Sequence, residues 1–283
     1  MTPLPVLLTP GRAALCRSAG YGLRGLLGGN TLAVVLAAFC FSILAGEARA
    51  EASAAGLLGV LALLLKWAPL IFQGFLFNLL VSVLSMLAGT VLGLWLGLGR
   101  VSQFAALRRA SSAVIQFFRN APWLVLLFYC MFLLPFSVTL PFATIPLPDA
   151  AKAVIGLSLP VMANVAEIVR GGVRSIPLEQ WESGEALAFS RRQILWMVIL
   201  PQCLRRMIPP WMNLYAILTM STTLISVVGI QDSMTLARAA LVAEGRTELF
   251  IPMYLMLLSW FFLYCYPIAR WTTALERRFQ VRI

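Results

Sequence analysis

Few residues of this chain are able to do chemistry, and two of them stand together at the edge of an apolar run. Asn164 and Glu167 are spaced i, i+3, so they share one face of a helix. An ionisable group at membrane depth costs roughly 2.5–3.5 kcal/mol, which invites a functional interpretation. The pair predicts a site for an amino or guanidinium group. The structural alternative is that Glu167 pairs with Arg170 or Arg174.

A second candidate is a cluster of hydroxyl groups near position 220. Its members are Thr219, Ser221, Thr222 and Thr223. Hydroxyls can meet both charges of a zwitterion, so the cluster is a candidate binding surface for one. The alternative is that each hydroxyl bonds the backbone of its own helix.

Several classes of chemistry are excluded by what the sequence lacks. There is no histidine, which removes His-based triads and His-ligated metals, and no GxxxxGK[ST] phosphate loop is present. The five cysteines contain no CxxC pair, so no zinc site or disulfide framework is indicated. A net charge of +11 allows nucleic acid as a partner, but basic cytoplasmic loops explain it better, and we expect no nucleic acid.

Composition places these residues in a membrane protein. Apolar residues make up 60% of the chain, charged residues only 12%, and mean hydropathy is +0.88. Six apolar runs have the length of roughly 20 residues that is needed to cross a bilayer. They cover 25–46, 74–99, 122–135 extended to 140, 150–169, 208–230 (with Pro209 and Pro210 at its start) and 250–269. The stretch 54–65 is too short to span and is predicted to lie at the interface.

The distribution of Lys and Arg predicts the orientation. Most of them fall in the two tails and in the loops after the second and fourth runs, and basic loops stay in the cytoplasm. Both termini are therefore expected in the cytoplasm, which an even number of six crossings allows. The first run is expected to be an uncleaved anchor. If it were instead a cleaved signal peptide, the remaining loops would keep their sides.

The loop after the fourth run predicts two short helices in the cytoplasm. The first begins with Ser175 as N-cap and Pro177 in its first turn, and ends near Phe189. Ser190 caps the second, expected over 193–200. This is the shape of a docking element, although a solvated connecting loop is the alternative.

The same loop resembles the EAA loop of ABC-importer permeases. Counting back from Pro201 places Glu182 on the motif glutamate, Ser183 and Gly184 on the two alanines, and Ala188 on the motif glycine. Other stretches resemble the polar amino-acid uptake subfamily, namely 166–177, 180–182, 118–124 and 223–229. The resemblance covers roughly 69–282.

The resemblance implies a fold, partners and a mechanism. The expected fold is all-α, a polytopic helical membrane protein with about six transmembrane helices and a cytoplasmic coupling loop. Residues 1–68 form a tail, an extra anchor helix and a short external segment, and residues 69–283 form the permease domain. Coupling to the ATPase is expected from Glu182, Ser183, Gly184, Glu185, Ala186 and Ala188. The small residues among them are expected to let the loop helix enter a cleft of the ATPase.

The expected partners are cytoplasmic ATPase subunits, a second identical or homologous permease, a periplasmic or lipid-anchored binding protein, and membrane lipid. The chain itself is not expected to be an enzyme or to hold a cofactor, because ATP and Mg are bound by the ATPase. It is expected to be a multi-pass protein of the bacterial inner membrane that moves polar amino acids or related compounds.

Two rival functions remain open at this point. An ion-coupled secondary transporter needs paired ionisable groups at the midplane and inverted repeats, and neither is seen. An intramembrane enzyme needs a nucleophile with a base, or metal ligands, and the sequence has no histidine and no paired intramembrane aspartates.

The substrate within the amino-acid class is left open by the sequence, with arginine, glutamine, glutamate, cystine and opines as candidates. Where the subfamily often has Lys-Asp, this chain has Met220 and Ser221.

Overall fold

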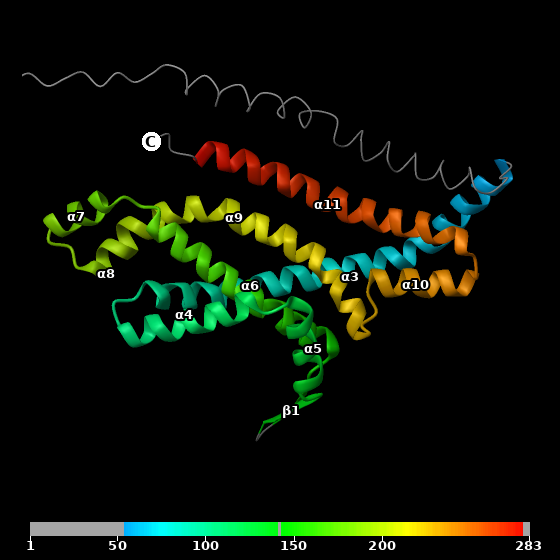
Figure 1. The fold of residues 1–283 in the computed structure, drawn as a ribbon, viewed down its shortest axis with the longest axis horizontal. Helices are drawn as coiled ribbons and strands as arrows, with labels where there is room; N and C mark the ends of the chain where they lie inside the picture. Colours follow the sequence, from blue (N-terminus) through cyan, green and yellow to red (C-terminus); the bar gives the residue numbers. More distant parts are fainter. Residues whose placement is uncertain (1–53, 141–142, 280–283) are drawn as a thin grey trace, which may run out of the picture.

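The computed structural model describes residues 54–140 and 143–279, and it is an elongated bundle of helices (Figure 1). Within these residues four helical stretches are long and apolar enough to cross a membrane. Helices α4 and α5, bent by 102° at the break between them, provide a fifth if they form one span. Five crossings are the number expected in this part of the chain, because the predicted first run, 25–46, lies outside the described residues.

The elements follow one another in a simple order. They are α3 (Ala54–Val101), α4 (Ala105–Asn120), α5 (Trp123–Leu133), β1 (Ser137–Leu140), β2 (Ala143–Pro146), α6 (Asp149–Arg174), α7 (Leu178–Ala186), α8 (Arg191–Gln193), η1 (Ile194–Ile199), α9 (Leu200–Ser221), η2 (Thr222–Val228), α10 (Ser233–Glu244), η3 (Thr247–Leu249) and α11 (Phe250–Phe279).

The predicted interfacial stretch 54–65 is not a separate element. Helix α3 is continuous for 48 residues and carries Pro69 inside it. The stretch 54–65 and the predicted run 74–99 therefore form one helix. The domain boundary expected between 68 and 69 falls within this helix, where no break in the backbone marks it.

The predicted third run was wrong in its extent. Helix α5 ends at Leu133, because Leu134 precedes Pro135 and takes an extended conformation, with φ −76° and ψ 135°. Strand β1 follows and pairs antiparallel with β2. The residues just before Pro122, expected in a loop, form α4, so the apolar run is only the second half of a bent helix pair.

Helices α3 and α6 approach each other closely along a stripe of glycines on α3. A Cβ atom added at Gly93 would lie 2.6 Å from Cβ of Val165 and 2.7 Å from the carbonyl oxygen of Met162. Gly89 and Gly97 lie one helical turn away on either side. A Cβ atom added at Gly89 would lie 2.5 Å from Val161, and one added at Gly97 would lie 2.7 Å from Val169, both on α6. This supports helix packing as the role of the repeated GxxxG pattern.

A second apolar core joins α11, α10 and the first half of α3. Helix α10 was not predicted. It is held to α3 at Gly74, where a Cβ atom would lie 2.6 Å from the backbone nitrogen of Ser233. At its other end Glu244 accepts hydrogen bonds from Lys66 (2.6 Å) and Trp67 (2.8 Å). These bonds hold the pKa of Glu244 below its usual range.

The glycine stripe predicts a difference between two substitutions on α3. Gly93→Ala places a methyl group against the backbone of α6, and we expect it to destabilise the fold by about 1–3 kcal/mol. Gly59→Ala is the matched control, because no atom lies within 4 Å of its added Cβ. It should be neutral or stabilising by up to about 1 kcal/mol, since alanine favours helix. Thermal unfolding in detergent measures both, and equal shifts would contradict the packing role.

Candidate functional site

The predicted cytoplasmic loop lies at one end of the molecule, where α7 and α8 project beyond the helix bundle (Figure 1). Helix α7 begins two residues later than predicted, with Pro177 as its N-cap. Ser175, the predicted N-cap, is the C-cap of α6. Its amide donates to the carbonyls of Gly171 and Gly172, so it completes the preceding helix and cannot start the next.

Helix α7 ends in a tight left-handed turn at Ala188. The amide of Phe189 donates to the carbonyl of Gly184 (3.1 Å), and that of Ala188 donates to Glu185 (2.9 Å). This pair of bonds is the Schellman motif. Ala188 has φ +57°, the only positive φ of a non-glycine residue in the described part of the chain. An alanine therefore occupies a left-handed conformation at the position where the EAA motif has glycine.

Gly184, one of the predicted coupling residues, faces the inside of this chain. Gly184 is buried, and a Cβ atom there would lie 2.8 Å from Cγ1 and 3.0 Å from Cδ1 of Ile194. Its small size therefore serves packing inside this chain, between α7 and η1. A residue at this position cannot meet another protein without first displacing Ile194.

The opposite face of α7 is open to solvent. Glu179, Glu182, Ser183 and Ala186 are exposed, and their i, i+3, i+4, i+7 spacing places them on one face. Two of the four are carboxylates, and the other two are small. We call these four residues the acidic face of α7.

The other predicted coupling residues differ in their surroundings. The Glu185 carboxylate is engaged by Arg191 of α8 at 3.2 Å. Leu178 and Leu187, at either end of α7, are 67% and 69% exposed outside the apolar spans.

The second predicted loop helix exists but does not stop at Pro201. Ser190 and Gln193 form a capping box, as the Ser190 prediction requires. The helix then continues through a π-helical turn, η1, into α9. Pro201 lies in the first turn of α9, where a missing amide proton is tolerated. Pro209 and Pro210 lie inside α9 rather than at its start.

Hydrogen bonds join the loop to α9. Gln202 donates to the side chain of Gln180 on α7 at 3.3 Å. Arg206 donates to the backbone carbonyl of Ser175, at the end of α6. The Gln202–Gln180 bond and the Gly184–Ile194 contact connect α7 to the helix that continues into α9, and the Arg206 bond connects α9 to the end of α6.

Glu167 is surrounded by arginines of this chain. Its carboxylate lies 2.7 Å from Arg170, 3.6 Å from Arg119 and 4.0 Å from Arg100. Three helices, α3, α4 and α6, contribute to this cluster. The arrangement favours the structural alternative for Glu167 and does not bring it together with the hydroxyl cluster.

Asn164 and the four hydroxyls bond their own helices. The Asn164 amide donates to the carbonyl of Pro160 at 2.8 Å. Each hydroxyl of the cluster donates to a carbonyl three or four residues earlier, at 2.7–3.0 Å. Thr219 and Thr222 are fully buried, whereas Ser221 and Thr223 are partly open.

A buried polar cluster around Asn78 was missed. Its amide donates to Asp232 (3.2 Å) and to Thr222 (3.3 Å), and its oxygen accepts the backbone amide of Ser233 (3.3 Å). The sequence features that could have revealed this cluster are a lone asparagine in an apolar run and Asp232, which is the N-cap of α10. The cluster joins α3, η2 and α10, and Thr222 belongs to it.

Comparison with known proteins assigns the fold to a family. Residues 89–281 match the model of the binding-protein-dependent transport system inner membrane component. The chain belongs to this family. It is a multi-pass transport component, which excludes the secondary-transporter and intramembrane-enzyme alternatives, and ATP hydrolysis lies in a separate subunit of such systems.

Individual relatives agree with this assignment. The permease is 32% identical to a probable amino-acid ABC transporter permease of Bacillus subtilis, over 75% of this chain and 89% of the relative. It is 30% identical to the L-cystine transport system permease of the same organism, over 74% and 86%. The fold matches the crystal structure of an amino acid ABC transporter with a TM-score of 0.67 at 24% identity, covering 76% of this chain and 96% of that one.

The turn at Ala188 of this permease predicts a stabilising substitution. A left-handed conformation costs an alanine about 1–2 kcal/mol, and glycine avoids that cost. Ala188→Gly should therefore slow hydrogen exchange of the Phe189 amide about fivefold. Ala186→Gly, two residues earlier in the helix, should speed it up. Faster exchange in both variants would show that the turn is not strained.

Proposed function

We propose that this permease is the membrane-spanning subunit of an ABC importer for polar amino acids or related compounds. The names of its relatives support the substrate class, and the loop motif supports the ATP-driven mechanism. In this proposal a partner ATPase binds ATP and Mg, a second permease completes the pathway, and a binding protein delivers the substrate. The observation that carries the proposal is α7, a helix with an exposed acidic face, held by packing and hydrogen bonds to α9.

The mechanism follows from those contacts. The acidic face of α7 enters the ATPase, whose closure on ATP displaces α7. Because Gly184 is packed on Ile194 and Gln180 is bonded to Gln202, α9 must follow the displacement. Helix α9 contacts α3, α6 and α11, so its movement reorients the spans around the substrate path.

The arrangement of the basic residues supports an orientation. The α7–α8 end of the bundle also holds the end of α3, which carries Arg100, together with the end of α6, the start of α9 and the last turns of α11 (Figure 1). In the proposed orientation this end is cytoplasmic, with both termini on the same side. Helix α10, at the opposite end of the bundle, then lies toward the outer face (Figure 1).

Asn164, Ser221 and Thr223 are the predicted substrate residues best placed for that role. They are only partly buried. Each of them donates one hydrogen bond within its own helix, and its side-chain oxygen has lone pairs that can accept a hydrogen bond from a substrate ammonium. Glu167, Thr219 and Thr222 contribute by holding the surrounding helices in position.

Transport by the complete system tests the function. The permease, its ATPase and its binding protein are reconstituted in liposomes, and uptake of labelled glutamine, arginine, glutamate and cystine is measured with and without ATP. We expect uptake of at least one of them only with ATP and loaded binding protein. Uptake driven by an ion gradient without ATP would contradict the proposal.

The acidic face predicts a specific coupling defect. Glu182→Lys reverses a charge on this face, and we expect at least a tenfold loss of ATPase retained during purification. Glu276→Lys makes the same change at an exposed position of α11 and should leave retention unchanged. Equal retention in the two variants would show that α7 does not dock the ATPase through this face.

A further inference from the structure

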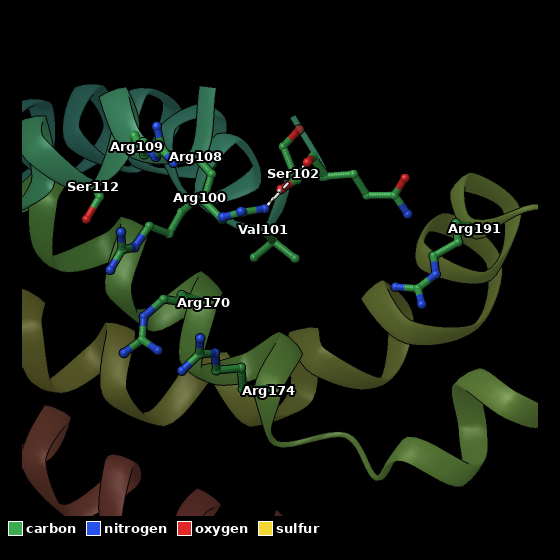
Figure 2. Close-up of a pocket in the computed structure, with 10 residues that line it drawn as sticks. Arg100, Val101, Ser102, Arg108, Arg109, Ser112, Arg170, Arg174 and Arg191 are labelled. Carbon is green, nitrogen blue, oxygen red and sulfur yellow. Dashed lines mark hydrogen bonds between the residues drawn. The ribbon is translucent and has the colours of Figure 1, made fainter. Parts of the chain in front are cut away.

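A cavity lined by arginines lies beside the coupling loop. It has a volume of about 540 Å³, within the range of small-molecule sites. Three segments surround it, namely the turn from α3 into α4, the end of α6 and the start of α8, and Figure 2 shows their guanidinium groups around a common space. The six arginines are Arg100, Arg108, Arg109, Arg170, Arg174 and Arg191.

The positive charge of this cavity is only partly balanced by the chain itself. Glu167 binds Arg170 and lies 4.0 Å from Arg100. Glu185 binds Arg191. Neither carboxylate lines the cavity, and two carboxylates for six guanidinium groups leave a positive excess. Guanidinium groups held this close repel one another unless an anion lies between them.

Two of the arginines are free to bind such an anion. Arg108 donates to the backbone carbonyls of Ser102 and Gln103, at 3.2 and 3.4 Å. Arg109 and Arg174, by contrast, make no hydrogen bond or ion pair within the described residues. They come from α4 and α6, on two walls of the cavity (Figure 2).

We propose that this cavity binds a phosphate group. A guanidinium group presents paired N–H donors that match two oxygens of a phosphate group, whether it is a monoester or a diester. Two sources share this chemistry, an anionic phospholipid headgroup and a soluble phosphate compound. Basic pockets at the cytoplasmic ends of membrane helices suit lipid headgroups. The choice between the two sources rests on the proposed orientation, but phosphate binding itself does not.

Titration with inorganic phosphate tests the site. The unfolding midpoint of the purified permease is measured in sodium phosphate and in sodium chloride of equal ionic strength. Phosphate should raise the midpoint more than chloride does. The double variant Arg109→Gln/Arg174→Gln should weaken the apparent phosphate affinity at least tenfold. The matched control Arg192→Gln/Arg205→Gln removes the same charge from exposed positions outside the cavity and should leave the affinity unchanged.

A double variant with lysines distinguishes loss of phosphate binding from loss of folding. Arg109→Lys/Arg174→Lys keeps both charges, so it should retain most of the phosphate response even if the glutamine variant folds poorly. The proposal is overturned if phosphate does no more than chloride, as expected if acidic residues of a partner protein fill the cavity instead. It is also overturned if the two glutamine double variants lose affinity equally.

Nanodiscs identify the source of the phosphate. The permease is placed in phosphatidylglycerol or phosphatidylcholine discs, and native mass spectrometry counts the lipids it retains. A headgroup site predicts retained phosphatidylglycerol that the Arg109→Gln/Arg174→Gln variant loses, and a weaker phosphate response in phosphatidylglycerol discs. A soluble ligand predicts the same phosphate response in both discs. Either result supports phosphate binding. Because neither measurement involves transport, failure of the phosphate proposal is distinguishable from failure of the transport proposal.

Discussion

The close contact between α3 and α6 is the constraint on which the rest of this structure depends. Three glycines on α3 allow three valines of α6 to approach the helix backbone, and any side chain at Gly93 would push the two helices apart. Helices in lipid gain little from hydrophobic burial against each other, so close packing of small residues contributes much of their association. The position of α6 in turn fixes where the coupling loop leaves the bundle.

The loop is built so that its position depends on that contact. Helix α6 ends at Arg174 and is capped by Ser175, whose carbonyl accepts a hydrogen bond from Arg206 of α9, and α7 begins at Leu178. Gly184 then packs on Ile194 while Ala188 turns the chain back toward α8. The loop is therefore a short, bonded connection between two long helices rather than a solvated linker.

Much of this was predictable from sequence, because long apolar runs and capping residues act locally. The runs at 74–99, 150–169 and 250–269 lie within α3, α6 and α11, and the Ser190 cap was predicted. The predictions failed where contacts between residues distant in sequence determine the secondary structure. The arginines of α4 indicated a loop, yet Arg119 pairs with Glu167 of a neighbouring helix. Helix α10 is too short to be recognised as a span, and its start is fixed by Asn78, which is distant in sequence.

The candidate site shows the same division. Spacing identified the residues of α7 but not which of them face outward, since the small size of Gly184 fits docking and internal packing equally well.

The arginine cavity could not be predicted for a related reason, because its six arginines come from three separate segments that were assigned to basic loops. Arg191 belongs to α8, whereas the other five belong to the region from α3 to α4 and to α6. A displacement of α7 and α8 by the ATPase would therefore change the spacing of guanidinium groups around the cavity. In the proposed complex, a bound phosphate favours whichever spacing lets both walls reach it, so its binding and the position of the coupling loop would be thermodynamically linked.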